Sequence, residues 1–449
     1  MTDATHVVTA FLRTDGRILL LRRSDAVGTY AGQWGGVSGY AEGDPDEQVW
    51  VEIDEETGLA DAVDLVRSGR ALEFHDADLD RDWVVHPYLF DCNSRAVEVS
   101  DEHVEYEWVH APEIRRRETV PELWTAYERV TPSVRTIAAD DERGSAHLSI
   151  VALGILRDRA AVTADPTTGE ADAEAAGELA RLARRLVEAR PSMAALRNRV
   201  NRVMAAADDP GEVETVAADA IDRAVTADEE AARIAAERVA GERVLTLSRS
   251  GTVLTALRGS DRHEGGGPED RGAVDGSDSE EGETDDDPPT PPEGLYVAES
   301  RPAREGITVA EALAGTLPVT VHTDAAVAHV LAEEAVDAVL VGADTVLPDG
   351  RVLNKTGTRT VAAAAAREGV PVFVVAAADK VSPHEAVNRE FGPSGDLYDG
   401  DAPVDVLNPT FDVTPADLVD AVVTERGALS TDAVGSVAEE HRENADWSL

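Results

Sequence analysis

The second half of the chain repeats one pattern, in which a short apolar run rich in β-branched residues is followed by an Ala-rich stretch. The runs are RVLTLS from 243, GLYVAES from 294, PVTVHT from 318, DAVLVGAD from 337 and PVFVVAAA from 371. Buried strands that alternate with helices are typical of a parallel, doubly wound, Rossmann-like sheet. Ligands bind such sheets beyond the carboxyl ends of the strands, so the residues after each run are the first candidates for chemistry.

The first part of the chain predicts a small α+β domain instead. Residues 6–23, HVVTAFLRTDGRILLLRR, predict a β-hairpin around TDG, and the later runs DWVVHPYLFDC and VEYEWVHA predict further strands. The segment DPDEQVWVEIDEET, after the hairpin, predicts a helix. We therefore expect an α/β chain with four parts: an α+β domain over 1–117, a helical segment over 118–240, a Rossmann-like part over 241–430, and a tail over 431–449.

One segment inside the Rossmann-like part cannot contribute to a core. Residues 258–294 contain no aromatic residue and include the acidic run DGSDSEEGETDDD followed by PPTPP. Such a composition predicts a disordered surface insertion. The spacing and flanking helices of a calcium-binding loop are missing from it.

The charge of the chain limits its partners and indicates its surroundings. The formal net charge is −47, and only Lys355 and Lys380 among the basic residues are lysines. This acidity argues against direct binding to nucleic acids or anionic membranes, and the composition resembles that of proteins from salt-loving archaea. A single cysteine, Cys92, no signal-peptide pattern and no apolar run of about 20 residues favour a cytoplasmic protein.

A cluster of carboxylates in the predicted N-terminal helix has the spacing of a metal site. Glu52, Glu55 and Glu56 stand at i, i+3 and i+4, on one helix face, where they repel one another unless a cation lies among them. Oxygen ligands suit Mg²⁺ or Mn²⁺, which can hold a diphosphate and activate a water molecule. An acidic, solvated helix face is the alternative, because 88 of the 449 residues are Asp or Glu.

With the upstream Gly35-Gly36 and the ending Gly58-Leu59, this segment resembles the Nudix box of Nudix hydrolases. The resemblance implies an α/β/α sandwich, a metal site at Glu52, Glu55 and Glu56, catalytic roles for Glu52 and Glu55, and a nucleoside diphosphate derivative as substrate. Two positions depart from the family pattern. Val51 stands where the family has arginine, and Gly43 stands where it has a glutamate.

A second set of motifs follows in order from residue 142. They are ERGSAH, ARPS, LTLSRSG, AESRPAREG, VHTDAAVAHV, VGADTVLPDGRVLNKTGT and NPTFDVTPADLVDAVVTERG. Together they resemble the family that unites the alpha, beta and delta subunits of translation initiation factor 2B with two sugar-phosphate isomerases, which act on methylthioribose 1-phosphate and ribose 1,5-bisphosphate. The resemblance implies a dimer or larger homo-oligomer formed through this domain.

Phosphate binding is the chemistry that the basic residues of these motifs predict. Arginines in so acidic a chain suit an anion, a glycine lets backbone amides approach it, and a rare lysine indicates a need for a point charge. The predicted substrate-binding residues are Arg143, Gly144, Arg190, Arg301, Asn354 and Lys355.

By the same resemblance, the isomerases use a cysteine and an aspartate to move a hydrogen between two sugar carbons. Asp344 matches the aspartate, but Ser248 replaces the cysteine, and a hydroxyl is a much weaker acid than a thiol. Two hypotheses therefore remain. The chain is a Nudix hydrolase whose second domain is a regulatory or translation-factor-like sensor of a phosphorylated sugar or nucleotide, or that domain is an active ribose-phosphate isomerase with Asp344 and Ser248 as catalytic groups.

Overall fold

The computed structural model describes residues 4–140, 143–163, 171–258, 290–387 and 389–447, which form two compact units. The first unit holds the described residues up to 136 together with 154–163, and the second holds 137–153 and the described residues from 171 onward. The first unit therefore extends beyond the boundary that the sequence predicted at residue 117. Most of the predicted disordered insertion, residues 259–289, lies outside the described residues.

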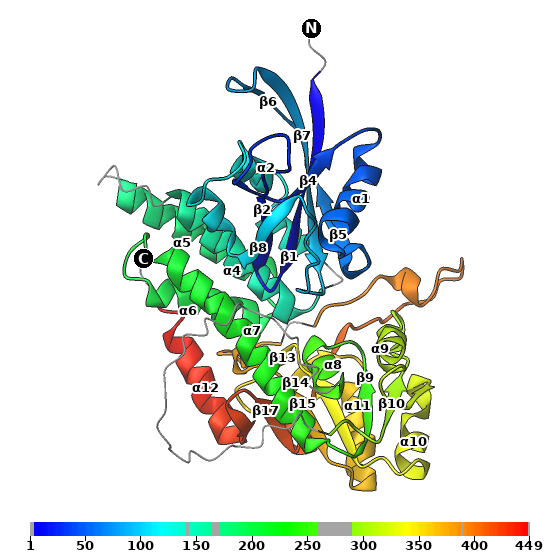
Figure 1. The fold of residues 1–449 in the computed structure, drawn as a ribbon. Coiled ribbons are helices and arrows are strands. Elements are labelled where there is room, and N and C mark those ends of the chain that lie inside the picture. Colours follow the sequence, from blue (N-terminus) through cyan, green and yellow to red (C-terminus); the bar gives the residue numbers. More distant parts are fainter. Residues whose placement is uncertain (1–3, 141–142, 164–170, 259–289, 388, 448–449) are drawn as a thin grey trace, which may run out of the picture. The chain divides into compact units, whose positions relative to one another are not determined.

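The first unit is built on an eight-stranded mixed sheet (Figure 1). The order β3-β2-β1-β7-β5 forms its main path, with β4 paired to β1, β6 to β7 and β8 to β2. The hairpin predicted over 6–23 is confirmed, because β1 and β2 pair antiparallel. The strands are β1 (Thr5–Thr14), β2 (Arg17–Arg23), β3 (Trp34–Gly35), β4 (Val37–Tyr40), β5 (Val63–Ser68), β6 (Leu72–Asp76), β7 (Arg81–Cys92) and β8 (His103–Val109).

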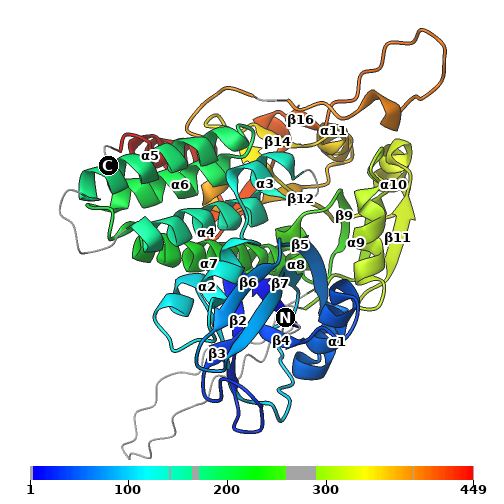
Figure 2. The ribbon, with the colours of Figure 1, turned by 90° about the horizontal axis from the view of Figure 1, so that it is seen from above.

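Two helices, α1 (Pro45–Thr57) and α2 (Leu123–Glu128), pack on opposite faces of this sheet (Figures 1 and 2). Alternate residues of β1 show why. Ala10 packs in a core with Ile53 of α1, whereas Phe11 packs in a second core with Leu123 of α2. Burial on both faces by alternating side chains produces the predicted α/β/α sandwich.

The predicted helix DPDEQVWVEIDEET is α1, and its ends follow from its sequence. Asp44 caps the amino end by accepting a hydrogen bond from the Asp46 backbone N–H, and Pro45 occupies the first turn. Gly58 ends the helix with a φ of 65°, a left-handed conformation that glycine adopts without steric cost.

The second unit contains a seven-stranded sheet in the order β11-β10-β9-β12-β15-β17-β18. All neighbours are parallel except the last pair, β17 and β18. From β9 the chain builds the sheet first to one side and then, from β12, to the other, so β9 and β12 flank the point where the order reverses. The strands are β9 (Arg243–Leu247), β10 (Gly294–Ala298), β11 (Val319–His322), β12 (Ala338–Gly342), β15 (Val372–Val375), β17 (Ala421–Thr424) and β18 (Gly427–Leu429).

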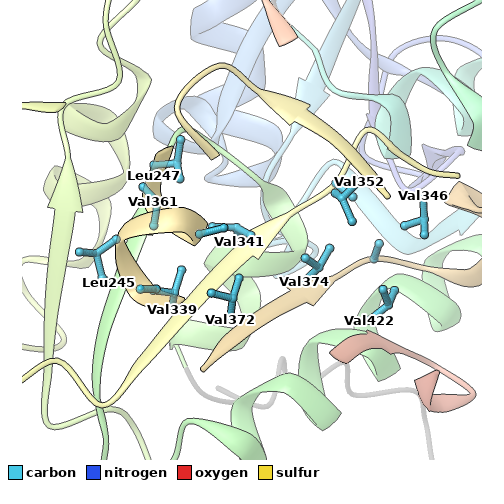
Figure 3. Close-up of a cluster of buried hydrophobic side chains, with 14 of the residues drawn as sticks. Leu245, Leu247, Val339, Val341, Val346, Val352, Val361, Val372, Val374 and Val422 are labelled. Carbon is cyan, nitrogen blue, oxygen red and sulfur yellow. The ribbon is translucent and has the colours of Figure 1, made fainter. Parts of the chain in front are cut away.

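Helices cover both faces of this sheet, as a doubly wound fold requires. On one face α7 (Val213–Arg238), α8 (Gly251–Arg258) and α9 (Glu305–Leu313) pack on residues such as Val244 and Leu340. On the other, α10 (Val327–Glu333), α11 (Thr358–Glu368) and α12 (Thr431–Glu443) pack on Leu245, Val339 and Val341 (Figure 3). The alternation along each strand confirms the predicted Rossmann-like sheet.

The rest of the second unit is mainly helical, with one small sheet. The helical segment contains α3 (Val134–Ala139), α4 (Ser145–Thr163), α5 (Ala171–Ala189) and α6 (Ala194–Ala206), and α4 is divided between the units after Leu153. The strands β13 (Thr345–Val346), β14 (Val352–Lys355) and β16 (Phe411–Thr414) form an antiparallel sheet that the sequence did not predict. Within the described ranges, no helix combines the length and apolar character that crossing a membrane requires.

The C-terminal segment 431–449, expected to be a tail, contains α12, which contributes to the core. Val434, Val437 and Ala438 are buried in the same cluster as the central strands. These positions, with the buried His441, recur at the three- and four-residue spacing of one helix face.

Candidate functional site

A cavity of about 400 Å³ lies in the first unit, on the face of the sheet that α2 covers. Its lining comes mainly from β1, β4, β6, β7, α1, α2 and the segment 23–30. Val7 of β1 pairs with Tyr40 of β4 on one side and with Val85 of β7 on the other. All three line the cavity, so the sheet forms a continuous floor.

Glu52 reaches this cavity by passing Gly39. A Cβ atom added at Gly39 would lie 2.0 Å from the Glu52 carboxyl carbon, so only glycine leaves room for the carboxylate in its present position. Glu52 accepts a hydrogen bond of 2.8 Å from Gln48. Burial raises the pKa of Glu52, the Gln48 amide offsets part of this, and the charges of Glu55 and Glu102 raise it further. Glu55 also lines the cavity.

Glu56, the third predicted carboxylate, is 3% exposed. Its Oε2 accepts a hydrogen bond of 3.1 Å from the Ser38 backbone N–H, while its Oε1 has no hydrogen-bond partner among the described residues. Burial raises the pKa of Glu56 well above its ordinary value, and the Ser38 N–H compensates only in part. His103 Nε2 lies 4.0 Å from Oε2, but burial and Arg23 lower the pKa of His103 to about 4, so a neutral imidazole stands there at pH 7.

The donor set fits a divalent cation, although it is not assembled as a closed site. In the part of the chain that the structure describes, no three His, Cys, Asp or Glu side chains are gathered closely enough to hold an ion as they stand. A buried carboxylate oxygen without a hydrogen-bond partner nevertheless costs folding free energy, and Glu56 Oε1 is such an oxygen. The charge of Glu52 also raises the pKa of Glu56. A hard cation would satisfy both groups. The three-carboxylate metal site therefore stays a prediction.

The structure offers another positive charge where the box arginine is missing. Val51 is 44% exposed and does not line the cavity. Arg23, at the end of β2, is the only basic side chain among the described residues that line it. The charge of Arg23 acts on Glu56, whose pKa it lowers in part, and its Nε donates a hydrogen bond of 3.1 Å to the Thr29 carbonyl oxygen. Sequence reasoning missed Arg23, which looks like an ordinary strand end.

In the second unit, the two predicted catalytic residues lie at the point where the strand order reverses. Ser248 directly follows β9, and Asp344 comes two residues after β12. Parallel strands place their carboxyl ends at one edge of the sheet, and crevices at such a reversal are the usual ligand sites of this fold. The patterning of the strands alone was enough to locate this edge.

Ser248 is held in a polar cluster that includes a carboxylate not predicted from the sequence. Its backbone has a φ of 58°, an uncommon value outside glycine, and its N–H donates a hydrogen bond of 2.6 Å to Ser300 Oγ. The Ser248 hydroxyl donates a hydrogen bond to Glu305 Oε2. Lys355 Nζ donates to the other oxygen of Glu305 at 3.0 Å. Glu305 thus links Ser248 to Lys355 at the start of α9.

Asp344 lies close to both lysines of the chain. Burial raises the pKa of Asp344, the charges of Lys380 and Lys355 lower it in part, and Glu305 and Glu390 raise it. Lys380 is 6% exposed and donates a hydrogen bond of 2.7 Å to the Ala343 carbonyl oxygen. Burial lowers the pKa of Lys380. Lys380 was not predicted as a site residue, although its rarity in an arginine-rich chain was a usable signal.

The structure does not gather the six predicted phosphate-binding residues into one cluster. The first pair that it links is Arg143 and Arg190. Arg143 donates a hydrogen bond of 2.9 Å to the Asp140 carboxylate, and Arg190 donates one of 2.6 Å to the Asp140 carbonyl oxygen. Arg190 also lies 3.8 Å from Glu390, one of the charges that act on Asp344.

Asn354 is buried and donates a hydrogen bond of 2.9 Å to Thr358 Oγ1, one strand residue away from Lys355. Gly144 precedes α4, and its carbonyl oxygen accepts a hydrogen bond from the Leu148 N–H at 3.1 Å. Arg301 is exposed, and its backbone N–H donates a hydrogen bond of 2.7 Å to Asp324. The structure therefore ties Lys355 to Ser248 through Glu305, and joins Arg143 to Arg190 through Asp140. Among the residues that the structure describes, no hydrogen bond ties the Arg301 side chain to either group.

Comparison with known proteins assigns both parts of the chain. The model of the initiation factor 2 subunit family matches residues 141–431. The chain belongs to this family. Residues 3–131 match the NUDIX domain model, so the chain is a NUDIX domain fused to an initiation factor 2 subunit domain.

Curated relatives and solved structures of this family resemble parts of the chain. A methylthioribose-1-phosphate isomerase of Pseudomonas savastanoi pv. phaseolicola is 39% identical over 149 residues, 30% of this chain and 41% of that protein. The isomerase of Heliobacterium modesticaldum is 37% identical over 147 residues, 30% of this chain and 43% of that protein. The chain thus spans about two fifths of the length of the curated relatives that it matches. A crystal structure of the Pyrococcus horikoshii OT3 translation initiation factor eIF-2B shares the fold, with a TM-score of 0.50 and 24% identity over 66% of this chain and 94% of that one.

Proposed function

We propose that the NUDIX domain hydrolyses a nucleoside diphosphate derivative with the help of Mg²⁺ or Mn²⁺. The observation that supports this most is the cavity of about 400 Å³ that Glu52 and Glu55 of the box line. NUDIX domains generally use divalent metal ions. A substrate diphosphate is strongly anionic, and among the described residues the cavity is lined by five glutamates but only one arginine. A cation is therefore needed to bind the diphosphate next to these carboxylates.

Each carboxylate has a distinct part in this proposal. A cation held by Glu52, Glu55 and Glu56 would screen the diphosphate and lower the pKa of a bound water. Glu56 contributes the oxygen that has no other partner. Glu52, whose pKa burial raises, is placed to accept a proton from water at the cavity. Arg23 supplies positive charge to a phosphate oxygen within the same cavity.

Replacement of Glu55 by glutamine tests this function. The substitution removes a ligand charge without changing the shape of the side chain, so hydrolysis should fall sharply while the melting temperature stays the same. A panel of nucleoside diphosphate derivatives, assayed by chromatography in high salt with Mg²⁺, measures the effect. Glu47→Gln is the matched control, because Glu47 lies exposed on the same helix and does not line the cavity. Equal turnover by both variants would contradict the assignment.

For the second domain we propose the binding of a phosphorylated ribose or nucleotide, as a regulatory or translation-factor-like function. Support comes from Lys355 and Lys380, whose charges act on Asp344 at the edge of the sheet, and from Arg190, which lies 3.8 Å from Glu390. Cations with preorganised hydrogen bonds suit phosphate. We also propose that this domain forms a homodimer or larger homo-oligomer. Sedimentation of the full chain in high salt measures the assembly.

Catalysis by the second domain is a second candidate, favoured by the Ser248–Glu305 hydrogen bond. A carboxylate beside the serine offers a proton-transfer group that serine alone lacks, and the curated relatives are named as methylthioribose-1-phosphate isomerases. Ribose 1,5-bisphosphate incubated with the protein would then yield a ketose detectable by NMR. Glu305→Gln should abolish the product and Glu311→Gln, an exposed change on the same helix, should not. A ligand-induced rise in melting temperature without product would support the sensor.

A further inference from the structure

The Glu56 carboxylate is held by the protein at one of its two oxygens. Its Oε2 accepts the hydrogen bond from the Ser38 backbone N–H, and the same Oε2 lies 4.0 Å from His103 Nε2. Its Oε1 has no hydrogen-bond partner among the described residues. The groups around Glu56 therefore gather at one oxygen and leave the other oxygen for the cation of the proposed function.

His103 is a buried histidine at the start of β8. It pairs with Arg23 of β2, and its backbone N–H donates a hydrogen bond of 3.1 Å to the Ser100 carbonyl oxygen. Its side chain is 1% exposed. Burial and the charge of Arg23 lower the pKa of His103 to about 4, so the imidazole is neutral at pH 7. A neutral imidazole has a single N–H donor, on either Nδ1 or Nε2.

The surroundings of His103 favour the tautomer with the proton on Nε2. Nδ1 has no hydrogen-bond partner among the described residues, so a proton there would be a buried donor without an acceptor, which is unfavourable. That tautomer would also direct the Nε2 lone pair at the Glu56 carboxylate. A proton on Nε2 instead directs a donor toward Oε2, the oxygen that the Ser38 N–H already holds.

A neutral donor suits a carboxylate that binds a cation. A protonated histidine beside Glu56 would add a second positive charge to that of Arg23 and would repel a divalent cation on the other carboxylate oxygen. A neutral N–H can orient the carboxylate without this repulsion. Groups that hydrogen-bond to metal ligands in this way contribute to metal affinity although they do not touch the metal.

We propose that His103 is a positioning residue of the metal site: its Nε2–H donates a hydrogen bond to Glu56 Oε2 and so keeps Oε1 turned toward the cation. The present separation of 4.0 Å is too long for a hydrogen bond, and a movement of about 1 Å brings the two atoms into range. Hydrogen bonds to an ionised carboxylate are shorter than those to neutral groups, so the contact should tighten when a cation binds Glu56. This inference rests on the proposed function, because it names the group that orients one of its metal ligands.

Binding of Mn²⁺ tests this proposal without any turnover. Mn²⁺ is titrated into the full chain in high salt, and electron paramagnetic resonance measures the free ion. Because the chain is strongly acidic, Glu56→Gln is titrated in parallel to measure the Mn²⁺ that binds elsewhere. The unmodified chain should show an additional, tighter site that Glu56→Gln lacks.

Two variants of His103 separate its donor from its bulk. His103→Leu keeps a buried side chain but removes the donor, and should weaken Mn²⁺ binding at the additional site about 10–100-fold. His103→Gln keeps an N–H at a similar distance from the backbone and should retain most of the affinity. His75→Leu is the matched control, because His75 is exposed on β6, contacts Asp82 and does not line the cavity.

Melting curves separate positioning from a loss of structure. His103→Leu should melt close to the unmodified chain, because it replaces a buried ring whose Nδ1 has no partner by an apolar group. If the leucine variant does not fold, the asparagine variant His103→Asn keeps the test valid. Its shorter amide stands where Nδ1 stood and cannot reach Glu56, so it should weaken Mn²⁺ binding as well. Pulsed resonance spectra of the bound Mn²⁺ should show no directly bound nitrogen, since His103 is placed behind Glu56 and not on the cation.

The outcomes are distinct from those that test hydrolysis. Equal Mn²⁺ affinity in His103→Leu and His75→Leu, equal weakening by leucine and glutamine, or nitrogen bound to Mn²⁺ would each overturn the positioning role. If hydrolysis is lost in Glu55→Gln while His103→Leu binds Mn²⁺ normally, the proposed function stands and this inference fails. If the unmodified chain binds no more Mn²⁺ than Glu56→Gln does, the metal site fails and the positioning role fails with it.

Discussion

Replacement of Asp379 by asparagine should destabilise the second unit strongly. Asp379 lies in the turn 378–380, is 5% exposed, and accepts hydrogen bonds of 2.8 Å from Arg199 and 2.5 Å from Arg202. The Arg199 side chain is fully buried. Without the Asp379 charge, the remaining carboxylate beside Arg199 is Asp228, at 3.3 Å. Breaking a buried ion pair by removing one partner costs about 3–5 kcal/mol.

The lower end of that range applies here, because Asp228 keeps part of the compensation. A loss of about 3 kcal/mol corresponds to a fall in melting temperature of about 6–12 °C for a unit of this size. Differential scanning calorimetry in high salt measures it. The matched control is Asp349→Asn, which breaks a 2.6 Å ion pair with Arg351 at the surface and should cost less than about 1 kcal/mol.

A fall of less than about 2 °C for Asp379→Asn would refute this reasoning, since it would mean that Arg199 is tolerated as an unpaired charge or is hydrated. Asp379→Asn should also affect ligand binding at the candidate site of the second unit. Lys380 follows Asp379 directly and holds the Ala343 carbonyl oxygen beside Asp344, so a looser turn should weaken ligand binding there as well.

Three further predictions concern single groups. Gly39→Ala should leave the melting temperature nearly unchanged, because the flexible Glu52 can move away, but should reduce hydrolysis about 100-fold, the cost of misplacing a catalytic group by about 1 Å; unchanged kcat/KM would contradict this. Ser248→Cys should create or raise ketose formation by NMR if the second domain is a latent isomerase, and adding Asp344→Asn should abolish the gain; no ketose at any protein concentration would favour the sensor. Burial raises the pKa of Asp379, but Arg199 and Arg202 outweigh it and lower the pKa well below its usual range, so its stabilisation is fully present above the unfolded value near 3.9 and is lost gradually as pH falls from there through the lower folded pKa. The gap in melting temperature between wild type and Asp379→Asn should narrow steadily below about pH 4, and a constant gap would argue against the ion pair.

Much of the fold could be predicted because it depends on periodicity. Alternation along β9 and β12 and the Ala-rich stretches after them indicate a doubly wound sheet, and the end of each strand then locates Ser248 and Asp344. The same holds for α1, where the helical spacing and Gly58 identify the box. These features are local, so a single sequence carries them.

The residues that sequence reasoning missed depend on contacts between distant segments. Glu305 is one of 88 acidic residues, and nothing local distinguishes it from a solvated one. Arg199 is fully buried, although arginine is normally exposed, and its pairing with Asp379, 180 positions away, and with Asp228 explains this. The short strands β13, β14 and β16 are likewise too brief to stand out.

The place of the acidic insertion in the topology has a consequence for how this family can diversify. The insertion joins the end of α8, at Arg258, to the start of β10, at Gly294. Helices of a doubly wound sheet return the chain to the amino ends of the strands, so both anchor points belong to the edge opposite Ser248 and Asp344. The length and the net charge of this connection can therefore change during evolution, for example with the salt content of the solvent, without altering the chemistry at the other edge. The entropic cost of a longer connection also grows only slowly with its length.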